Sequence, residues 1–385
     1  MIYLDNSATT CLCEEAKKAM LSSMEDYANP SSLHKAGLSA QKMLTSARRS
    51  VAGAIGLRSA APGQIIFTSG GTEANNMAIF GSVYAKKRRI SNRIISTDSE
   101  HPSVENALKK LESDGFEVIR ISTREGQLDF DAYEKALEVA PLLVTMMMVN
   151  NETGALYDVA RAFDMAKKRA KETVTHCDAV QGFLKTGMNY SALHADLISI
   201  SSHKIHGPKG VGALIIDPLL IKSKQIVPTV YGGEQENGFR PGTENTVGIA
   251  GFGAAAEIGK AKFADNVKML GELREYALGT LLDEGFTLNI PKGSAAPHIL
   301  SIQMPNIKSE TVLHYLSASD ICVSSGSACS SHSGKTSRAL LAFGLSDREA
   351  DCTIRVSFGE YNTKDDVDAL VSTLKKGRDT LIRMK

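Results

Sequence analysis

The chain has 385 residues, of which 43% are hydrophobic, so it can bury a sizeable core and form one large domain with a smaller one. Its 44 basic and 43 acidic side chains leave a formal net charge of +1. The chain therefore lacks the excess of positive charge that binds nucleic acid non-specifically. The N-terminus lacks the pattern of a signal peptide, and no apolar run is long enough to cross a membrane. We therefore expect no direct binding to nucleic acid or membrane.

Residues 60–216 alternate short β-branched runs with stretches of helical periodicity. The expected strands are residues 64–68, 93–97, 117–122, 142–149, 174–178, 197–201 and 212–216, and the helical stretches between them include residues 73–89, 104–114 and 161–171. This alternation predicts an α/β fold with a mostly parallel seven-stranded sheet covered by helices on both faces. Ligands bind such sheets at the carboxyl ends of the strands.

The pattern changes after about residue 257. The expected elements there are a long helical stretch at 261–283, strands at 286–290, 298–304 and 353–358, and helices at 309–319 and 364–384. This mixture predicts a smaller α+β domain. We expect residues 16–257 to form the large domain, and residues 1–15 together with 258–385 to form the small one.

The chain has six cysteines, without a Cys-x-x-Cys pair or zinc spacing, so we expect no metal site and free thiols in a reducing cytoplasm. They are Cys11, Cys13, Cys177, Cys322, Cys329 and Cys352. Cys329 stands out because the segment from Ser324 to Ser331 has no large side chain and is typical of a loop. A thiol on such a loop is exposed and reactive, or it belongs to an ordinary surface loop. The other five cysteines are expected to be packing residues for the most part.

Three polar clusters follow expected strands. The segment from Phe67 to Glu73 leads from a strand into a helix, which favours an anion cradle or a plain capped turn. Asp178 ends a buried strand, where it pairs with a protonated heterocyclic nitrogen or caps the next helix. Lys204 follows a further strand, where it forms a Schiff base or stays a surface lysine. Together they match what pyridoxal phosphate requires: an anion cradle, a carboxylate for its pyridinium nitrogen and a lysine for its aldehyde.

A series of ordered motifs runs nearly from end to end of the chain. The motifs are Tyr3 to Thr10, Asn29 to His34, Phe67 to Asn76, Glu100-His101, Val149 to Gly154, His176 to Gln181, Ser201 to Gly212, Arg240 to Asn245, Ser324 to Ser331 and Arg355 to Gly359. In these motifs the chain resembles the NifS/IscS-type cysteine desulfurases. They are pyridoxal-phosphate enzymes of fold type I in the class V aminotransferase superfamily.

The resemblance implies pyridoxal 5'-phosphate as cofactor and L-cysteine as substrate. Lys204 would bind the aldehyde and later shuttle protons, and Asp178 would keep the pyridinium nitrogen protonated. His101 would stack on the ring and assist proton transfer; the alternative is a residue at the helix start held by Pro102.

The remaining site residues also take their roles from the resemblance. The cofactor's phosphate would be bound by Gly71, Thr72, Ser201 and His203. Thr243 from the other subunit of a homodimer would complete this phosphate-binding site.

Contacts to the ring oxygen or the substrate would come from Asn151 and Gln181. Arg355 would form a bidentate pair with the substrate carboxylate, the alternative being a structural ion pair.

The implied reaction is removal of sulfur from L-cysteine. The Cys329 thiolate would attack the substrate sulfur, alanine would leave, and a persulfide would remain on Cys329. The acceptor of that sulfur stays open between an iron–sulfur scaffold and an enzyme of tRNA or cofactor thiolation. The alternatives are another class V lyase, such as a selenocysteine lyase, and a non-catalytic partner that keeps only the fold.

The first part of the cysteine loop matches one group of the family, and the sequence after it differs from the family's usual one. The run from Ser324 to Cys329 is typical of the longer-loop group. Further on, Gly334-Lys335-Thr336 stands where the family usually has a Leu-Glu-Pro-Ser stretch, so the proline that stiffens the loop is missing. This departure bears on loop dynamics more than on the chemistry.

Overall fold

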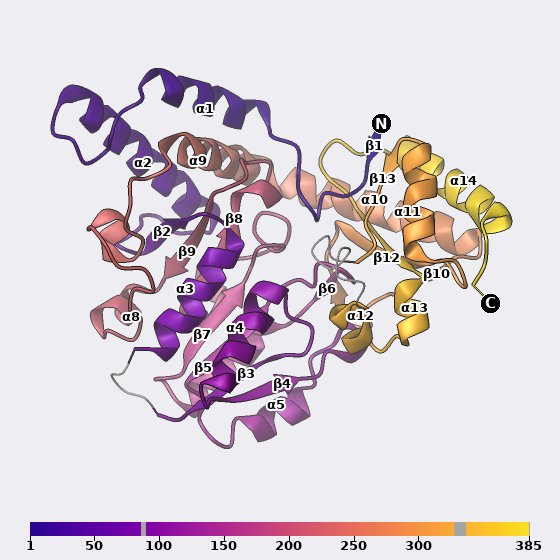
Figure 1. The fold of residues 1–385 in the computed structure, drawn as a ribbon, viewed down its shortest axis with the longest axis horizontal. Coiled ribbons are helices and arrows are strands. Elements are labelled where there is room, and N and C mark those ends of the chain that lie inside the picture. Colours follow the sequence, from indigo (N-terminus) through magenta and orange to yellow (C-terminus); the bar gives the residue numbers. More distant parts are fainter. Residues whose placement is uncertain (86–89, 327–335, 385) are drawn as a thin grey trace.

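The computed structural model describes residues 1–85, 90–326 and 336–384. Cys329, the expected sulfur acceptor, lies outside the described residues. Helices cover both faces of a central sheet, and α3 (Gly71–Val83) and α4 (Pro102–Ser113) lie on the face turned to the viewer in Figure 1. No helix in these ranges is long and apolar enough to span a membrane.

The central sheet has seven strands in the order β2-β9-β8-β7-β5-β3-β4. Their bounds are β2 Ile65–Thr68, β3 Arg93–Thr97, β4 Glu117–Ile121, β5 Leu143–Met147, β7 Val174–Asp178, β8 Leu197–Ser201 and β9 Gly212–Ile216. All neighbouring strands are parallel except β9, which is antiparallel to both β2 and β8. The inner strands β5, β7 and β8 are buried along their whole length, as expected for strands covered on both faces. The predicted α/β fold and its mostly parallel sheet are confirmed.

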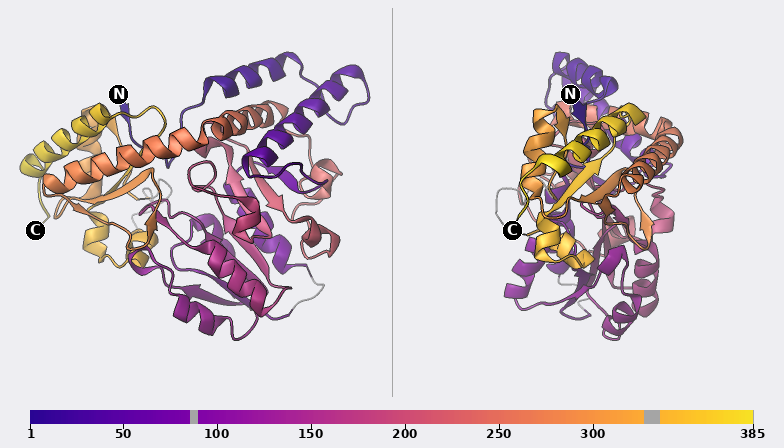
Figure 2. Two further views of the ribbon diagram at one scale, coloured as in Figure 1. Left: turned by 180° about the vertical axis from the view of Figure 1, so that it is seen from behind. Right: turned by 90° about the vertical axis from the view of Figure 1, so that its right-hand side faces the viewer.

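A three-stranded antiparallel sheet forms a second layer with its own apolar core. The order of its strands is β10 (Thr287–Leu288), β12 (Ile299–Gln303) and β14 (Thr353–Ser357). The helices α10 (Phe263–Asp283) and α11 (Ser309–Ala318) pack on it, and α14 (Lys364–Thr380) packs against both of these helices. Buried side chains of these elements form one hydrophobic cluster, separate from the clusters around the large sheet. Figure 2 shows α9 (Thr246–Ala261) and α10 running nearly end to end between the two parts.

The N-terminal segment connects the two sheets. β1 (Ile2–Tyr3) pairs in parallel with β13 (Ile321–Cys322), and Leu4 is buried in the core of the small sheet. The chain then crosses to the large sheet, where the Thr10 N–H donates to the carbonyl of His203. Figure 1 shows this indigo segment starting beside the small sheet and leading to α1 (Glu14–Glu25) on the opposite side. Residues between Leu4 and Thr10 therefore lie where the two sheets face one another.

The remaining elements are shorter or cover the outer faces. They are α1 Glu14–Glu25, α2 Lys35–Ala54, α5 Phe130–Ala136, α6 Val159–Arg169, α7 Tyr190–Leu193, α8 Pro218–Lys222, α9 Thr246–Ala261, α12 Arg338–Phe343, α13 Asp347–Asp351, the strands β6 Ala155–Leu156 and β11 Ser294–Ala295, and the 3₁₀ turns η1 Arg124–Gly126, η2 Ser202–Lys204 and η3 Gln235–Gly238.

Several sequence-based boundaries were wrong: for example, the strands expected at 142–149 and 286–290 are shorter, at Leu143–Met147 and Thr287–Leu288. The helix expected at 364–384 ends at Thr380, because the last residues turn back and the Met384 N–H donates to the carbonyl of Asn306. The helical stretch expected at 261–283 begins at Phe263, because Lys262 ends one helix, α9, and begins the next. The helices α1, α2 and α9 were not among the expected elements.

Candidate active site

A cavity of about 230 Å³ opens at the carboxyl ends of β5, β7 and β8. It is lined by Ser7, Ala8, Gly71, Thr72, Asn75, His101, Ser103, Met147, Val149, Asn151, Asp178, Val180, Gln181, Ser201, His203, Lys204 and Arg355. The structure thus brings together every described residue expected at the site except Thr243, which is exposed and lies outside this lining.

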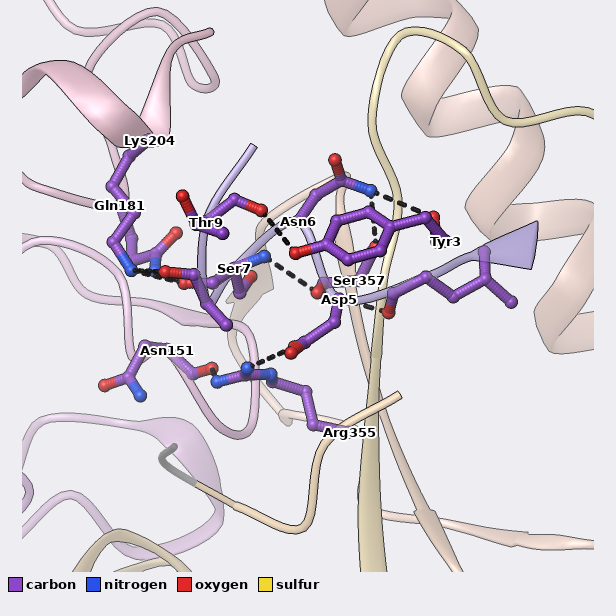
Figure 3. A network of polar contacts seen from close by, with 12 residues as sticks. Tyr3, Asp5, Asn6, Ser7, Thr9, Asn151, Gln181, Lys204, Arg355 and Ser357 are labelled. Atoms are coloured by element: carbon purple, nitrogen blue, oxygen red, sulfur yellow. Dashed lines mark hydrogen bonds and ion pairs between the residues drawn. The ribbon is translucent and has the colours of Figure 1, made fainter. Parts of the chain in front are cut away.

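Lys204 is held by the N-terminal segment. It ends η2, the tight turn that follows β8, and its Nζ donates to the backbone carbonyls of Ser7 at 2.5 Å and Ala8 at 2.8 Å. Figure 3 shows Lys204 and Gln181 converging on this segment. These two backbone carbonyls hold the amine at the cavity.

Asp178 is the last residue of β7 and is buried at 6% exposure. One carboxylate oxygen accepts a hydrogen bond from Asn75 Nδ2 at 2.7 Å, and the other accepts one from the Val180 N–H at 3.0 Å. A turn follows Asp178 rather than a helix, so the side chain does not cap one. These two donors fix the orientation of the carboxylate at the cavity.

His101 caps α4 and lines the cavity at the same time. Its Nδ1 accepts from the Ser103 N–H at 3.1 Å and lies 2.8 Å from Ser103 Oγ. Since Nδ1 accepts from the backbone, we assign the proton of the neutral ring to Nε2. Burial lowers the pKa of His101, and the positive Lys204 lowers it further, although the Asp178 carboxylate acts against both. His101 therefore caps α4 and also lines the cavity, and its role in the reaction stays a prediction.

The expected anion cradle combines a helix start with hydroxyl groups. Gly71 and Thr72 begin α3, where backbone N–H groups favour an anion. A Cβ on Gly71 would lie 2.7 Å from Val180 Cγ2, so the close packing there depends on glycine. Ser201 Oγ is buried and has no hydrogen-bond partner in the described ranges. Burial, with Lys204 adding to it, lowers the pKa of His203 to about 4, so this ring is neutral at neutral pH.

Arg355 is nearly fully buried, at 2% exposure, and its guanidinium contacts two partners. Nη2 pairs with Asp5 Oδ1 at 2.7 Å, and Nη1 donates to the backbone carbonyl of Asn151 at 2.9 Å. Nε has no partner among the described residues. Arg355 is thus part of a structural ion pair and still lines the cavity with donor capacity left.

Gln181 is held on both sides of its amide. Nε2 donates to the carbonyl of Ser7 at 2.8 Å, and Oε1 accepts from Lys185 Nζ at 3.3 Å. Sequence reasoning did not single out Lys185, Asn75 or Asp5. Asn75 and Asp5 lie within the quoted motifs, but their partners are far away along the chain, and no local pattern signals them.

Comparison with known proteins identifies the family. The profile of the family described as "Aminotransferase class-V" matches residues 2–370. The chain belongs to this family.

Among the relatives of this class-V chain is "Cysteine desulfurase IscS" of Dictyoglomus turgidum (strain DSM 6724 / Z-1310). It is 37% identical over 379 residues, which cover 97% of this chain and 94% of the relative. "Cysteine desulfurase IscS" of Escherichia coli O139:H28 (strain E24377A / ETEC) is 36% identical over 385 residues, covering 97% of this chain and 92% of the relative.

Solved structures agree with this family. A "NIFS-LIKE PROTEIN" superposes with a TM-score of 0.89 at 33% identity, covering 99% of this chain and 100% of that one. The NifS-like protein from Rickettsia africae ESF-5 has a TM-score of 0.87 at 32% identity, with coverage of 99% and 100%. The family expected from the motifs, and its fold, are therefore confirmed.

Proposed function

We propose that the chain is a cysteine desulfurase that removes sulfur from L-cysteine, releases L-alanine and holds the sulfur as a persulfide on Cys329. The observation that carries the proposal is the convergence of Lys204, Asp178, His101 and Arg355 on one cavity. Its support from outside the chain is the name of the relatives that match over nearly the whole length.

The cavity fits pyridoxal 5'-phosphate. Ser201 Oγ is a buried hydroxyl without a partner in the described ranges, and it lies in the same lining as the start of α3, where a phosphate would bind. Gly71, Thr72, Ser201 and His203 would hold the phosphate, with Thr243 added from the second subunit of a homodimer. When bound, this cofactor supplies an electron sink for negative charge at the amino acid's Cα.

Residues of the chain would bind the cofactor and the substrate and would transfer the protons. Asp178 would hold a proton on the pyridinium nitrogen, and Lys204 would carry the aldehyde and move a proton at the substrate's Cα. The His101 Nε2–H would face the ring and assist proton transfer. Arg355 would orient the substrate carboxylate with its remaining donors. Asn151 and Gln181 would contact the ring oxygen or the substrate.

The sulfur transfer would balance without an external oxidant. A sulfur–sulfur bond forms between Cys329 and the substrate as the substrate's carbon–sulfur bond breaks, and the carbon takes up a proton to give alanine. We propose that a second protein then accepts the sulfur, in iron–sulfur cluster assembly or in thiolation of tRNA or a cofactor, within a reducing cytoplasm.

We also propose the domain division given by the sequence, with residues 16–257 as the large domain and residues 1–15 and 258–385 as the small one. The separate apolar cluster of the small sheet, which includes Leu4, supports it.

The experiment is single-turnover reaction of the purified chain with L-cysteine. We expect alanine and one added sulfur atom on the Cys329 peptide by mass spectrometry. Cys329→Ala should form neither at an appreciable rate, whereas Cys11→Ala, which alters an exposed cysteine, should match the wild type. Undiminished alanine formation by Cys329→Ala would rule out the proposed mechanism.

A further inference from the structure

Glu152 is a buried acidic residue to which the mechanism proposed above assigns no role. It lies in the turn that follows β5, and only 6% of it is exposed. The turn is held by Asn150 Oδ1, which accepts from the N–H groups of Glu152 and Thr153 at 3.0 Å each. The preceding residue, Asn151, lines the candidate active site, and its carbonyl accepts from Arg355 Nη1 (Figure 3). Glu152 therefore occupies a fixed position directly behind the cavity.

The Glu152 carboxyl group holds the start of α12. Ser337 Oγ donates to Glu152 Oε2 at 2.5 Å, across 185 positions of the chain, and the same hydroxyl caps α12 by accepting from the Leu340 N–H. The next residue, Arg338, pairs with Glu105 of α4. Two carboxyl groups from other elements thus fix the start of α12, so the helix keeps one attachment when the other is removed.

Gly326 lies against the same carboxyl group. Its φ is +73°, and a Cβ built on it would lie 2.8 Å from Glu152 Oε2 and 3.7 Å from Ser337 Cβ. Only glycine allows this close approach together with this backbone conformation. Gly326 and Ser337 flank the stretch of sequence that contains Cys329. Both ends of that stretch therefore meet at Glu152.

The same contacts reach Arg355 from both ends. The Ser324 N–H donates to the Arg355 carbonyl at 3.1 Å, and the Arg355 N–H donates to the Ser324 carbonyl at 2.6 Å. The Arg355 side chain bonds the carbonyl of Asn151, the neighbour of Glu152. The two flanks of the Cys329 stretch are thus fixed relative to the arginine proposed to bind the substrate carboxylate.

We propose that Glu152 is a positioning residue for sulfur transfer, because its carboxyl group holds the two ends of the Cys329 stretch together beside Arg355. Glu152 itself does not line the cavity, so it acts through the residues that it holds. Sulfur transfer requires the Cys329 thiolate to meet the substrate's sulfur, and a misplacement of about 1 Å can cost about a hundredfold in rate. The role in transfer rests on the proposed function, in which Cys329 accepts the sulfur.

The contact with Ser337 needs an acceptor oxygen rather than a particular charge. Burial raises the pKa of Glu152, although the Ser337 hydrogen bond and the positive Arg355 act against this rise. Glutamine has nearly the same shape and keeps an oxygen that accepts from a hydroxyl. Glu152→Gln should therefore preserve the contact, whereas Glu152→Ala removes it.

The test compares two rates in the full chain loaded with pyridoxal phosphate. The first is exchange of the Cα hydrogen of L-alanine with deuterium from D₂O, which needs the cavity but not Cys329. The second is single-turnover formation of the Cys329 persulfide from L-cysteine, followed by mass spectrometry. In Glu152→Ala we expect persulfide formation to slow by about tenfold while the exchange changes by less than about twofold. Glu152→Gln should stay close to the wild type in both rates.

Ser337→Ala removes the other partner and should reproduce the effect of Glu152→Ala. Because the two changes break one contact, the double variant should be no slower than either single variant. The matched control is Ser346→Ala, which removes the N-terminal cap of the neighbouring α13 at an exposed position and should leave both rates unchanged.

Four results would overturn the proposal. They are unchanged persulfide formation in Glu152→Ala, an equal loss of both rates there, a loss in Glu152→Gln as large as in Glu152→Ala, and additive losses in the double variant. If Glu152→Ala does not fold, Ser337→Ala decides alone, because that side chain is only half-buried.

A second readout needs no activity and separates this inference from the proposed function. In cofactor-free chain, hydrogen exchange of the flanking peptides that contain Ser324 and Leu340 should be severalfold faster in Glu152→Ala than in the wild type or in Glu152→Gln. A wild-type chain that forms no persulfide, yet shows this difference, contradicts the proposed function and leaves the anchoring by Glu152 supported. Normal persulfide formation in the wild type and in Glu152→Ala, with equal hydrogen exchange, contradicts only the role of Glu152.

Discussion

Asp5 Oδ1 lies 2.7 Å from Arg355 Nη2, although the two residues are 350 positions apart in the chain. The same N-terminal segment supplies the Ser7 and Ala8 carbonyls that hold Lys204. Figure 3 shows Ser7 and Asp5 of this segment between Lys204 and Arg355. Residues directly after β1 thus neutralise the buried arginine at one side of the cavity and fix the lysine at the other. The N-terminal segment is therefore an integral part of the site.

Breaking this ion pair should destabilise the fold. In Asp5→Asn the Arg355 guanidinium stays buried with its charge unpaired, which costs up to about 3 kcal/mol because Asp5 itself is partly exposed. We expect the thermal unfolding midpoint to fall by several degrees in a scan of the full chain. The control is Glu310→Gln, since the Glu310–His314 contact is about 80% exposed on both sides and such pairs contribute little. Equal midpoints for the two variants would contradict the importance of the buried pair.

Substitution of the arginine itself should separate binding from chemistry. Arg355→Lys keeps the positive charge but loses the planar fork that can bind a carboxylate through two donors. We expect the KM for L-cysteine to rise by about tenfold or more, with a smaller change in kcat, in steady-state assays of alanine formation. A loss of kcat at unchanged KM would show that Arg355 does not orient the substrate carboxylate.

The sequence predicts those parts of the fold that local patterns determine. The strands β3, β7, β8 and β9 have the expected bounds, because each is a short buried run whose β-branched residues and neighbouring turns act locally. The C-terminal helix is shorter than expected, because its end depends on a contact with Asn306 that lies far back in the chain.

In the candidate site, too, local motifs could be predicted from the sequence and long-range contacts could not. The motifs and the resemblance located Lys204, Asp178, His101 and Arg355, and the structure gathers them in one cavity. The partners that hold them could not be predicted, because these contacts join distant segments and leave no periodic pattern. The bond from Asn75 to Asp178, for example, spans 103 positions.

The glycine that opens α3 should be required for phosphate binding. In Gly71→Ala the new Cβ would meet Val180 Cγ2 at 2.7 Å, so either the helix start or the strand-end turn must shift. We expect affinity for pyridoxal phosphate, measured by absorbance titration of the stripped chain, to fall by about tenfold. Gly271→Ala in α10 is the matched control, since a Cβ there meets nothing within 4 Å. That variant should bind the cofactor normally and gain about 0.5–1 kcal/mol of stability. Equal cofactor affinity in both variants would contradict a role for Gly71.

Glu100 should make the stability of the fold depend on pH. This carboxyl group is buried next to His101; Oε1 accepts from Thr97 Oγ1 at 2.7 Å and from the Met147 N–H at 2.9 Å. Burial raises its pKa to about 8, the two hydrogen bonds act against this rise, and the nearby Asp178 charge adds to it. The folded chain therefore keeps the Glu100 proton to much higher pH than the unfolded chain, in which the group ionises near its ordinary pKa of 4.5.

The sign of the effect follows from this difference. Between about pH 4.5 and about pH 8 the folded state binds the proton and the unfolded state has lost it, so this group's contribution to stability falls as the pH rises. Glu100→Gln cannot ionise and keeps an oxygen for Thr97 and Met147. We expect the free energy of unfolding of Glu100→Gln, relative to the wild type, to increase by a few kcal/mol from about pH 5 to about pH 8 in urea titrations. Parallel pH profiles of the two proteins would contradict a protonated Glu100, because only a group that binds protons differently in the two states can change the slope.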